Sequence, residues 1–185
     1  MPLPHYTQSR ASSQRYEPVQ PNLFEVTVFS PLGDDTGLIL EQVKTIGGLN
    51  NLNPAVDAIG QKYKFADRSF ASMPAQTFMD LTVNFSLNLN EANENYIYNT
   101  FRNWYKLIYD PLTGEMGLKK DYVGSMIIVQ YNRAGDIFRK ITCKDVFPTG
   151  QPDFVDELNY ETPDAVDLTM TYRCDHWVEE NVGAA

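Results

Sequence analysis

A strand followed directly by a helix dominates the middle of this sequence. From Met79 to Leu89 apolar and polar residues alternate without a break, a period of two that fits a β-strand with two different faces and cannot fit a helix. Asn90 then offers an N-cap, Glu91 and Glu94 place negative charge in a first helical turn, and apolar residues recur at helical spacing over 91–108. We predict a half-buried strand and an amphipathic helix whose aromatic side faces inward.

Shorter alternating segments on both sides of this pair indicate further strands. They cover residues 23–29, 38–46, 61–68, 125–131, 137–147 and 166–175. Gly135 stands in the short link 132–136, where a hairpin needs a positive φ. The chain is therefore predicted to be mainly β, an antiparallel β-sandwich or barrel of about seven strands with one flanking α-helix. Its predicted core includes Phe24, Phe85, Phe101, Trp104 and Trp177.

The length of 185 residues fits one domain. We expect a flexible N-terminal arm over 1–20, the β domain over 21–180 and a short tail over 181–185. Two long loops are predicted, over 47–60 and 148–163. The sequence shows neither a signal peptide nor an apolar run of the roughly 20 residues that cross a bilayer. We therefore expect synthesis in the cytosol and no membrane partner.

The net charge of −9 is concentrated near the C-terminus. Residues 145–185 carry ten acidic side chains against Arg173 alone. Such a region repels phosphate backbones, which disfavours nucleic-acid binding by counterion release. A solvated acidic face is its simplest explanation.

The residues that carry most enzyme chemistry are sparse. His176 adjoins Asp175, but neighbours on a strand point to opposite faces and cannot form an oriented pair. Cys143 and Cys174 belong to no CxxC motif and are predicted to be buried free thiols. The acidic C-terminal region lacks the ligand spacing of an EF-hand. We therefore predict no catalytic residues, no metal site and no cofactor.

Five segments in order carry a resemblance to a known family. They are PNLFEVTVF (21–29), FADRSF (65–70), IIVQYNRAGD (127–136), ITCKDVFPTG (141–150) and VDLTMTYRCDHW (166–177). The K-D-V-F-P-T turn and the final strand that ends at Trp177 are the most specific of them. Together they resemble the tail tube proteins of contractile-tailed, T-even-type bacteriophages, over about residues 20–178.

The resemblance implies a structural virion protein. Its subunits would form hexameric rings that stack into a hollow tube inside a contractile sheath, and the tube would conduct the genome during ejection. The implied partners are further copies of the chain, the sheath protein, and baseplate and tail terminator proteins, while DNA passes the lumen without specific binding. The implied location is the virion tail tube, with assembly in the host cytoplasm.

Two other functions fit the same sequence. A tube protein of a type VI secretion system or a related contractile injection system would share the fold. A small-ligand-binding β-barrel module would instead need a preformed apolar pocket.

Two sets of residues are candidates for a role in a tube. A water-filled bore needs a polar face, and the central strand supplies one without any lysine or arginine. Its members are Asp80, Thr82, Asn84, Ser86 and Asn88. The same face could instead pack under loops at the tube exterior. The loop 47–60 contains apolar residues with no periodic place in a core, and we predict that they contact the ring above or below: Leu49, Leu52, Val56 and Ile59.

Overall fold

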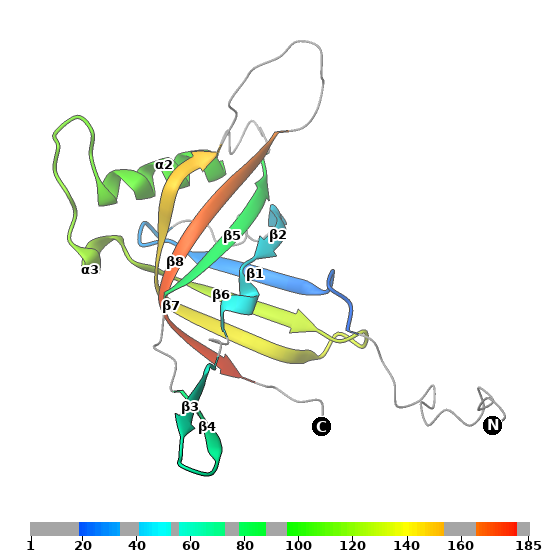
Figure 1. Cartoon of the computed structure of the whole chain (residues 1–185). Coiled ribbons are helices and arrows are strands. Elements are labelled where there is room, and N and C mark those ends of the chain that lie inside the picture. Colours follow the sequence, from blue (N-terminus) through cyan, green and yellow to red (C-terminus); the bar gives the residue numbers. More distant parts are fainter. Residues whose placement is uncertain are drawn as a thin grey trace, which may run out of the picture.

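The computed structural model describes six stretches of the chain, drawn in colour in Figure 1: residues 19–33, 41–52, 56–72, 78–87, 96–153 and 166–180. Several predictions fall outside these stretches. They concern most of the N-terminal arm, the C-terminal tail, the helix-capping residues Asn90, Glu91 and Glu94, and the bore candidate Asn88.

Six strands form one antiparallel sheet in the order β1-β6-β7-β8-β5-β2. Their bounds are Phe24–Phe29 (β1), Val43–Gly47 (β2), Met79–Ser86 (β5), Gly124–Tyr131 (β6), Ile137–Asp153 (β7) and Asp167–Glu180 (β8). A separate hairpin pairs β3 (Ala58–Lys62) with β4 (Asp67–Ala71). The helical elements are a 3-10 helix η2 (Leu49–Leu52) and two α-helices, α2 (Tyr96–Ile108) and α3 (Lys119–Tyr122). The predicted antiparallel, mainly β fold with a flanking helix is confirmed.

The two longest strands turn a corner and take part in both halves of the sheet. β7 pairs with β6 only as far as Val146, whereas β8 pairs with β5 through its first half and with β7 over most of its length. The β6–β7 register moves from Ser125↔Lys144 to Gly124↔Val146. It skips Asp145, whose φ is 54°. An extra residue of this kind is a β-bulge, which bends a strand, and β5 and β2 consequently cross β1 and β6 in Figure 1.

The core lies between the two halves of the sheet and α2. The odd positions of β5 are buried, as its alternation predicted. α2 inserts Phe101 and Trp104, and the Phe101 ring lies 5.0 Å from that of Phe85 and 6.0 Å from that of Tyr172. Phe24 and Trp177 are partly buried against this cluster. The opposite side of α2 is exposed, as predicted: Asn99, Arg102, Asn103 and Lys106.

Trp104 also fixes the segment that leads from α2 back to the sheet. Its indole Nε1 donates a hydrogen bond to the carbonyl oxygen of Tyr122 at 2.6 Å. A Cβ atom at Gly124 would lie 3.0 Å from the Trp104 ring and 2.2 Å from the carbonyl oxygen of Phe29. Glycine at the start of β6 therefore lets helix, strand β6 and strand β1 approach closely.

Two of the predicted strand boundaries are wrong. The second strand was predicted from residue 38, but within the described residues it begins at Val43. The predicted strand 61–68 instead spans the end of β3, a turn over 63–66 and the start of β4, since the Tyr63 amide donates to the Ala66 carbonyl at 2.9 Å and β3 pairs with β4 around it. Part of the predicted loop 47–60 accordingly belongs to η2 and β3.

The predicted loop 148–163 is also wrong at its start, because β7 continues to Asp153. Pro148 lies within this strand, although proline has no amide proton to donate to a sheet ladder. Among the described residues, however, β7 beyond Val146 has a ladder partner on one side only, namely β8. Proline is tolerated on such an edge.

Candidate functional site

The outward face of β5 continues onto both of its neighbours. β8 pairs with β5 so that Asp80 lies opposite Arg173, Thr82 opposite Thr171, Asn84 opposite Thr169 and Ser86 opposite Asp167. On the other side, Thr45 of β2 lies opposite Asn84. We call this surface of β2, β5 and β8 the polar face. It is built almost wholly of hydroxyl, amide and charged side chains because the alternate positions of β5 and β8 face the core.

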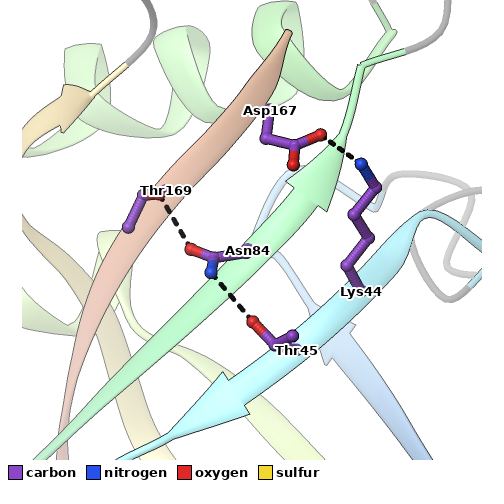
Figure 2. Close-up of polar contacts among 5 residues, drawn as sticks. All are labelled: Lys44, Thr45, Asn84, Asp167 and Thr169. Carbon is purple, nitrogen blue, oxygen red and sulfur yellow. Dashed lines mark hydrogen bonds and ion pairs between the residues drawn. The ribbon is translucent and has the colours of Figure 1, made fainter. Parts of the chain in front are cut away.

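Asn84 connects the three strands at the centre of the polar face. Its Nδ2 donates to Thr45 Oγ1 at 2.8 Å, and its Oδ1 accepts a hydrogen bond from Thr169 Oγ1 at 2.8 Å (Figure 2). Both ends of the amide are therefore engaged within the sheet. The side chain is held flat across the strands instead of extending freely into water.

An ion pair occupies one end of the polar face. Arg173 donates from Nε to Asp80 Oδ1 and from Nη2 to Asp80 Oδ2, both at 2.9 Å. The guanidinium carbon lies 5.5 Å from the centre of the Phe78 ring. The hydrogen bond from Arg173 lowers the pKa of Asp80 despite partial burial. The two side chains remain 40% and 46% exposed, so the pair stabilises the fold by only about 0.2–1 kcal/mol.

A second ion pair occupies the other end. Lys44 Nζ of β2 lies 2.5 Å from Asp167 Oδ1 of β8. Figure 2 shows this contact reaching across β5, which runs between the two strands. Strand β5 contains no cation, as the sequence indicated, but its neighbours bring Lys44 and Arg173 to the same face. Each of these cations is neutralised by a carboxylate.

The four bore candidates within the described residues, Asp80, Thr82, Asn84 and Ser86, thus share one half-buried face. The pairing partners on β2 and β8 were not identified from the sequence. Their positions on the face depend on register, which no local pattern encodes. The alternation of β8 was visible and could have suggested that Thr169, Thr171 and Arg173 share one side.

The four ring-contact candidates do not form one group. Val56 and Ile59 are 61% and 58% exposed. Leu49, in contrast, packs against the core of its own subunit, so the premise that it has no place there is wrong. The side chain of Leu52 lies outside the described residues.

The sequence did not reveal that β3 and β4 form an exposed hairpin. Every residue from Val56 to Ala71 is exposed, including Phe65 at 90% and Phe70 at 50%. The turn Tyr63–Ala66 contains no glycine or proline, and the alternation runs through it. Ordinary turn signals were therefore absent.

The described residues contain no group of three or more His, Cys, Asp or Glu side chains able to hold a metal ion. Cys143 and Cys174 are buried and free, and a hydrogen bond to Cys174 together with burial raises the pKa of the Cys143 thiol. Asp175 forms an ion pair with Lys119 and not with His176. None of the helices that the structure describes is both long and apolar enough to span a membrane.

No protein-family model matches this chain, and no curated protein matches it at a significant level. Solved structures do share its fold. A chain of the anti-feeding prophage cap, the tube terminating cap, superposes with a TM-score of 0.59 at 14% identity, covering 96% of this chain and 100% of that one. A chain of the PVC extracellular contractile injection system, in its extended sheath-tube complex, gives 0.55 at 14% identity with 97% and 100% covered.

A chain of the PVC sheath/tube terminator in the extended state gives a TM-score of 0.57 at 14% identity, with 90% of this chain and 99% of that chain covered. At such low identity these likenesses concern the fold. The tail-tube-like fold predicted from the sequence is confirmed.

Proposed function

We propose that this chain is the structural subunit of the tube of a contractile machine, and specifically of a phage tail tube. Copies would form hexameric rings that stack into a hollow tube through which DNA passes. The observation that carries the proposal is the polar face, on which Lys44 and Arg173 are each paired with a carboxylate. The shared fold with chains of tube-terminating and sheath-tube assemblies supports it.

The chemistry of the polar face suits a lumen. An unpaired lysine or arginine repeated around every ring would attract phosphates and retain DNA. Here the threonine, asparagine and serine side chains separate two neutralised pairs, and Asn84 is hydrogen-bonded on both sides. A lumen lined in this way lets hydrated DNA pass without binding its phosphates.

The outer face of the other half of the sheet, formed by β1, β6, β7 and the end of β8, carries apolar as well as polar side chains. One row of directly opposed residues crosses it from β1 to β8: Thr27, Ile127, Thr142 and Val178. Val178 is 52% exposed. Apolar β-branched side chains at the centre of an exposed sheet favour a protein contact. We assign this face to contacts between subunits and the polar face to the lumen.

The β3–β4 hairpin supplies a contact between rings. A lone two-stranded hairpin is marginally stable in water, and this one exposes apolar side chains on both strands, among them Ile59 and its partner Phe70. Burial of Val56 and Ile59 against a neighbouring ring would stabilise it. The further partners would be the sheath, baseplate and tail terminator proteins, and the assembled tube would belong to the virion.

A terminating subunit is the second candidate. Two of the structures that share the fold come from a tube terminating cap and a sheath/tube terminator. A terminator would form a ring that closes the end of a tube and would not continue it. A tube protein of an extracellular injection system, which conducts no genome, is a variant of the first proposal.

Negative-stain electron microscopy of the purified chain over a range of concentrations tests these proposals. Tubes of uniform bore support the tube subunit, whereas single rings that never stack support the terminator. A chain that stays monomeric at every concentration contradicts both.

The lumen assignment has its own test. Thr82 lies on the polar face and, unlike Asn84, makes no side-chain hydrogen bond to the residues that the structure describes. Thr82→Lys should assemble but slow DNA ejection, most at low ionic strength where screening is weak. Asn103→Lys, on the exposed side of α2, is the matched control. If Thr82→Lys particles eject at the wild-type rate at every salt concentration, the polar face does not line the lumen.

A further inference from the structure

The tip of the β3–β4 hairpin, residues 61–68, is basic and aromatic, although the protein as a whole is acidic. We call this tip the hook. Residues 61–68 contain Lys62, Lys64 and Arg68 against the single acid Asp67, while the chain as a whole carries a net charge of −9. Within the described residues none of these three cations forms an ion pair. The hook therefore carries positive charge that no acidic side chain of the described part of the subunit neutralises.

The hook also contains a hollow that side chains of a partner can enter. Tyr63, Lys64, Phe65, Ala66 and Arg68 line a hollow of about 480 Å³. Lys64 Nζ lies 5.5 Å from the centre of the Phe65 ring, and the Arg68 guanidinium carbon lies 5.9 Å from that of Tyr63. Cation–π contacts hold both cationic groups at the rim. Carboxylates would find two oriented donors there, and a guanidinium can bind a carboxylate through two hydrogen bonds.

The strongest source of carboxylates in the sequence is the segment that joins β7 to β8. Residues 154–165 carry Asp156, Glu157, Glu161 and Asp164 and no lysine or arginine. Figure 1 places the end of β7 and the start of β8 at the end of the molecule opposite to the β3–β4 hairpin. The two strand ends to which the acidic segment is attached thus lie opposite to the hook.

We propose that the hook of one copy binds the acidic segment 154–165 of a second copy. Two different surfaces meet in such a contact, which makes it heterologous, and a heterologous contact whose rotation does not close a ring propagates along an axis. The proposal rests on the proposed tube, in which it identifies the surfaces that join one ring to the next. Each single contact lies at the surface and is weak, but a ring would repeat it around its circumference, where multivalency adds to the total.

Charge reversal in the full-length chain tests this contact. The hook variant is Lys64→Glu with Arg68→Glu, and the segment variant changes all four acids of 154–165 to lysine: Asp156→Lys, Glu157→Lys, Glu161→Lys and Asp164→Lys. Each variant alone sets like charges against each other, and the concentration needed for assembly should rise by at least about tenfold. Because the hook is fully exposed, the hook variant should keep the wild-type melting temperature. Lys120→Glu with Arg133→Glu, two exposed cations elsewhere, is the matched control and should assemble normally.

Mixing the two variants gives the decisive result. In an equimolar mixture every junction can pair a hook with a segment of opposite charge, so assembly should return to within about threefold of the wild-type concentration. A contact within one copy would not be restored by mixing. Normal assembly of the hook variant alone, or failure of the mixture while both variants are folded, overturns the proposal.

Sedimentation velocity should accompany microscopy, because it detects association of any size. Open head-to-tail oligomers that form no tubes, and that the hook variant abolishes, would support the contact while contradicting the tube. Tubes that form equally well from wild type and the hook variant would support the tube while contradicting the contact.

Discussion

Arg173 of β8 holds both carboxylate oxygens of Asp80 of β5, with each donor atom 2.9 Å from its acceptor. This pair neutralises a cation on the surface that we assign to the lumen. The neutralisation of Arg173 on that surface therefore depends on the Asp80 carboxylate.

Asp80→Asn should therefore create a cationic site. Assembled tubes of this variant should bind short DNA at low ionic strength and release it as salt screens the interaction. Fluorescence anisotropy of labelled DNA over a salt series measures this effect. The double variant Asp80→Asn with Arg173→Gln restores neutrality and should bind no better than wild type. Equal binding by the single and double variants would show that Arg173 does not face the DNA.

The same pair predicts a pH dependence. The hydrogen bond from Arg173 holds the pKa of Asp80 below its ordinary value of 3.8. A carboxyl with a lowered folded pKa contributes its full stability above the unfolded value and loses it as the pH falls through the folded pKa. The contribution of Asp80 should thus be complete above pH 3.8 and decline below it.

Carbon-detected NMR titration of the Asp80 carboxyl can measure this pKa directly. Arg173→Gln should raise it, whereas Arg139→Gln, which removes a different surface partner, should leave it unchanged. A pKa that does not respond to Arg173→Gln would contradict the assigned cause.

Trp104→Ala should destabilise the domain strongly. The side chain is fully buried, and its indole donates to Tyr122. Truncation should lower the free energy of unfolding by about 3–5 kcal/mol, as measured by urea denaturation. Arg102→Ala on the exposed side of the same helix should change it by less than about 0.5 kcal/mol. Similar effects of the two substitutions would mean that α2 does not pack as described.

Tyr172→Phe should stabilise the domain. Burial raises the pKa of Tyr172 well above its usual range, and its hydroxyl has no hydrogen-bond partner among the described residues. Removing an unsatisfied buried hydroxyl should raise the free energy of unfolding by about 1 kcal/mol, while the aromatic ring keeps its contacts. Tyr131→Phe is the contrasting change, because the Tyr131 hydroxyl donates to Glu25. It should lower stability, and a loss of stability in both variants would show that the Tyr172 hydroxyl has a partner.

Local periodicity was sufficient to predict the elements with two distinct faces. The alternation of β5 identified its buried and polar sides, the helical spacing of α2 identified its aromatic side, and Gly135 marked the β6–β7 turn, where its φ is 91°. These features depend on residues close together in the chain, and their pattern is imposed by which side meets water.

Local periodicity did not predict features that depend on a pairing partner distant in the sequence. The β3–β4 turn contains no glycine or proline, so only the pairing of Ile59 with Phe70 reveals it. β7 passes through Pro148 because, in the part of the chain that the structure describes, no strand pairs with its far edge beyond Val146. No local sequence pattern indicates that a strand lies at the edge of a sheet.

The sequence by itself determined that one side of the central strand would be polar and that this strand would carry no cation. Only the tertiary structure decided that Arg173, 93 positions away, would lie opposite Asp80 and neutralise it. The reason is register. A side chain on β8 meets its partner on β5 only after the chain has bent at Asp145. The register between strands that are distant in the sequence is fixed by the packing of the whole core, and not by the paired residues themselves.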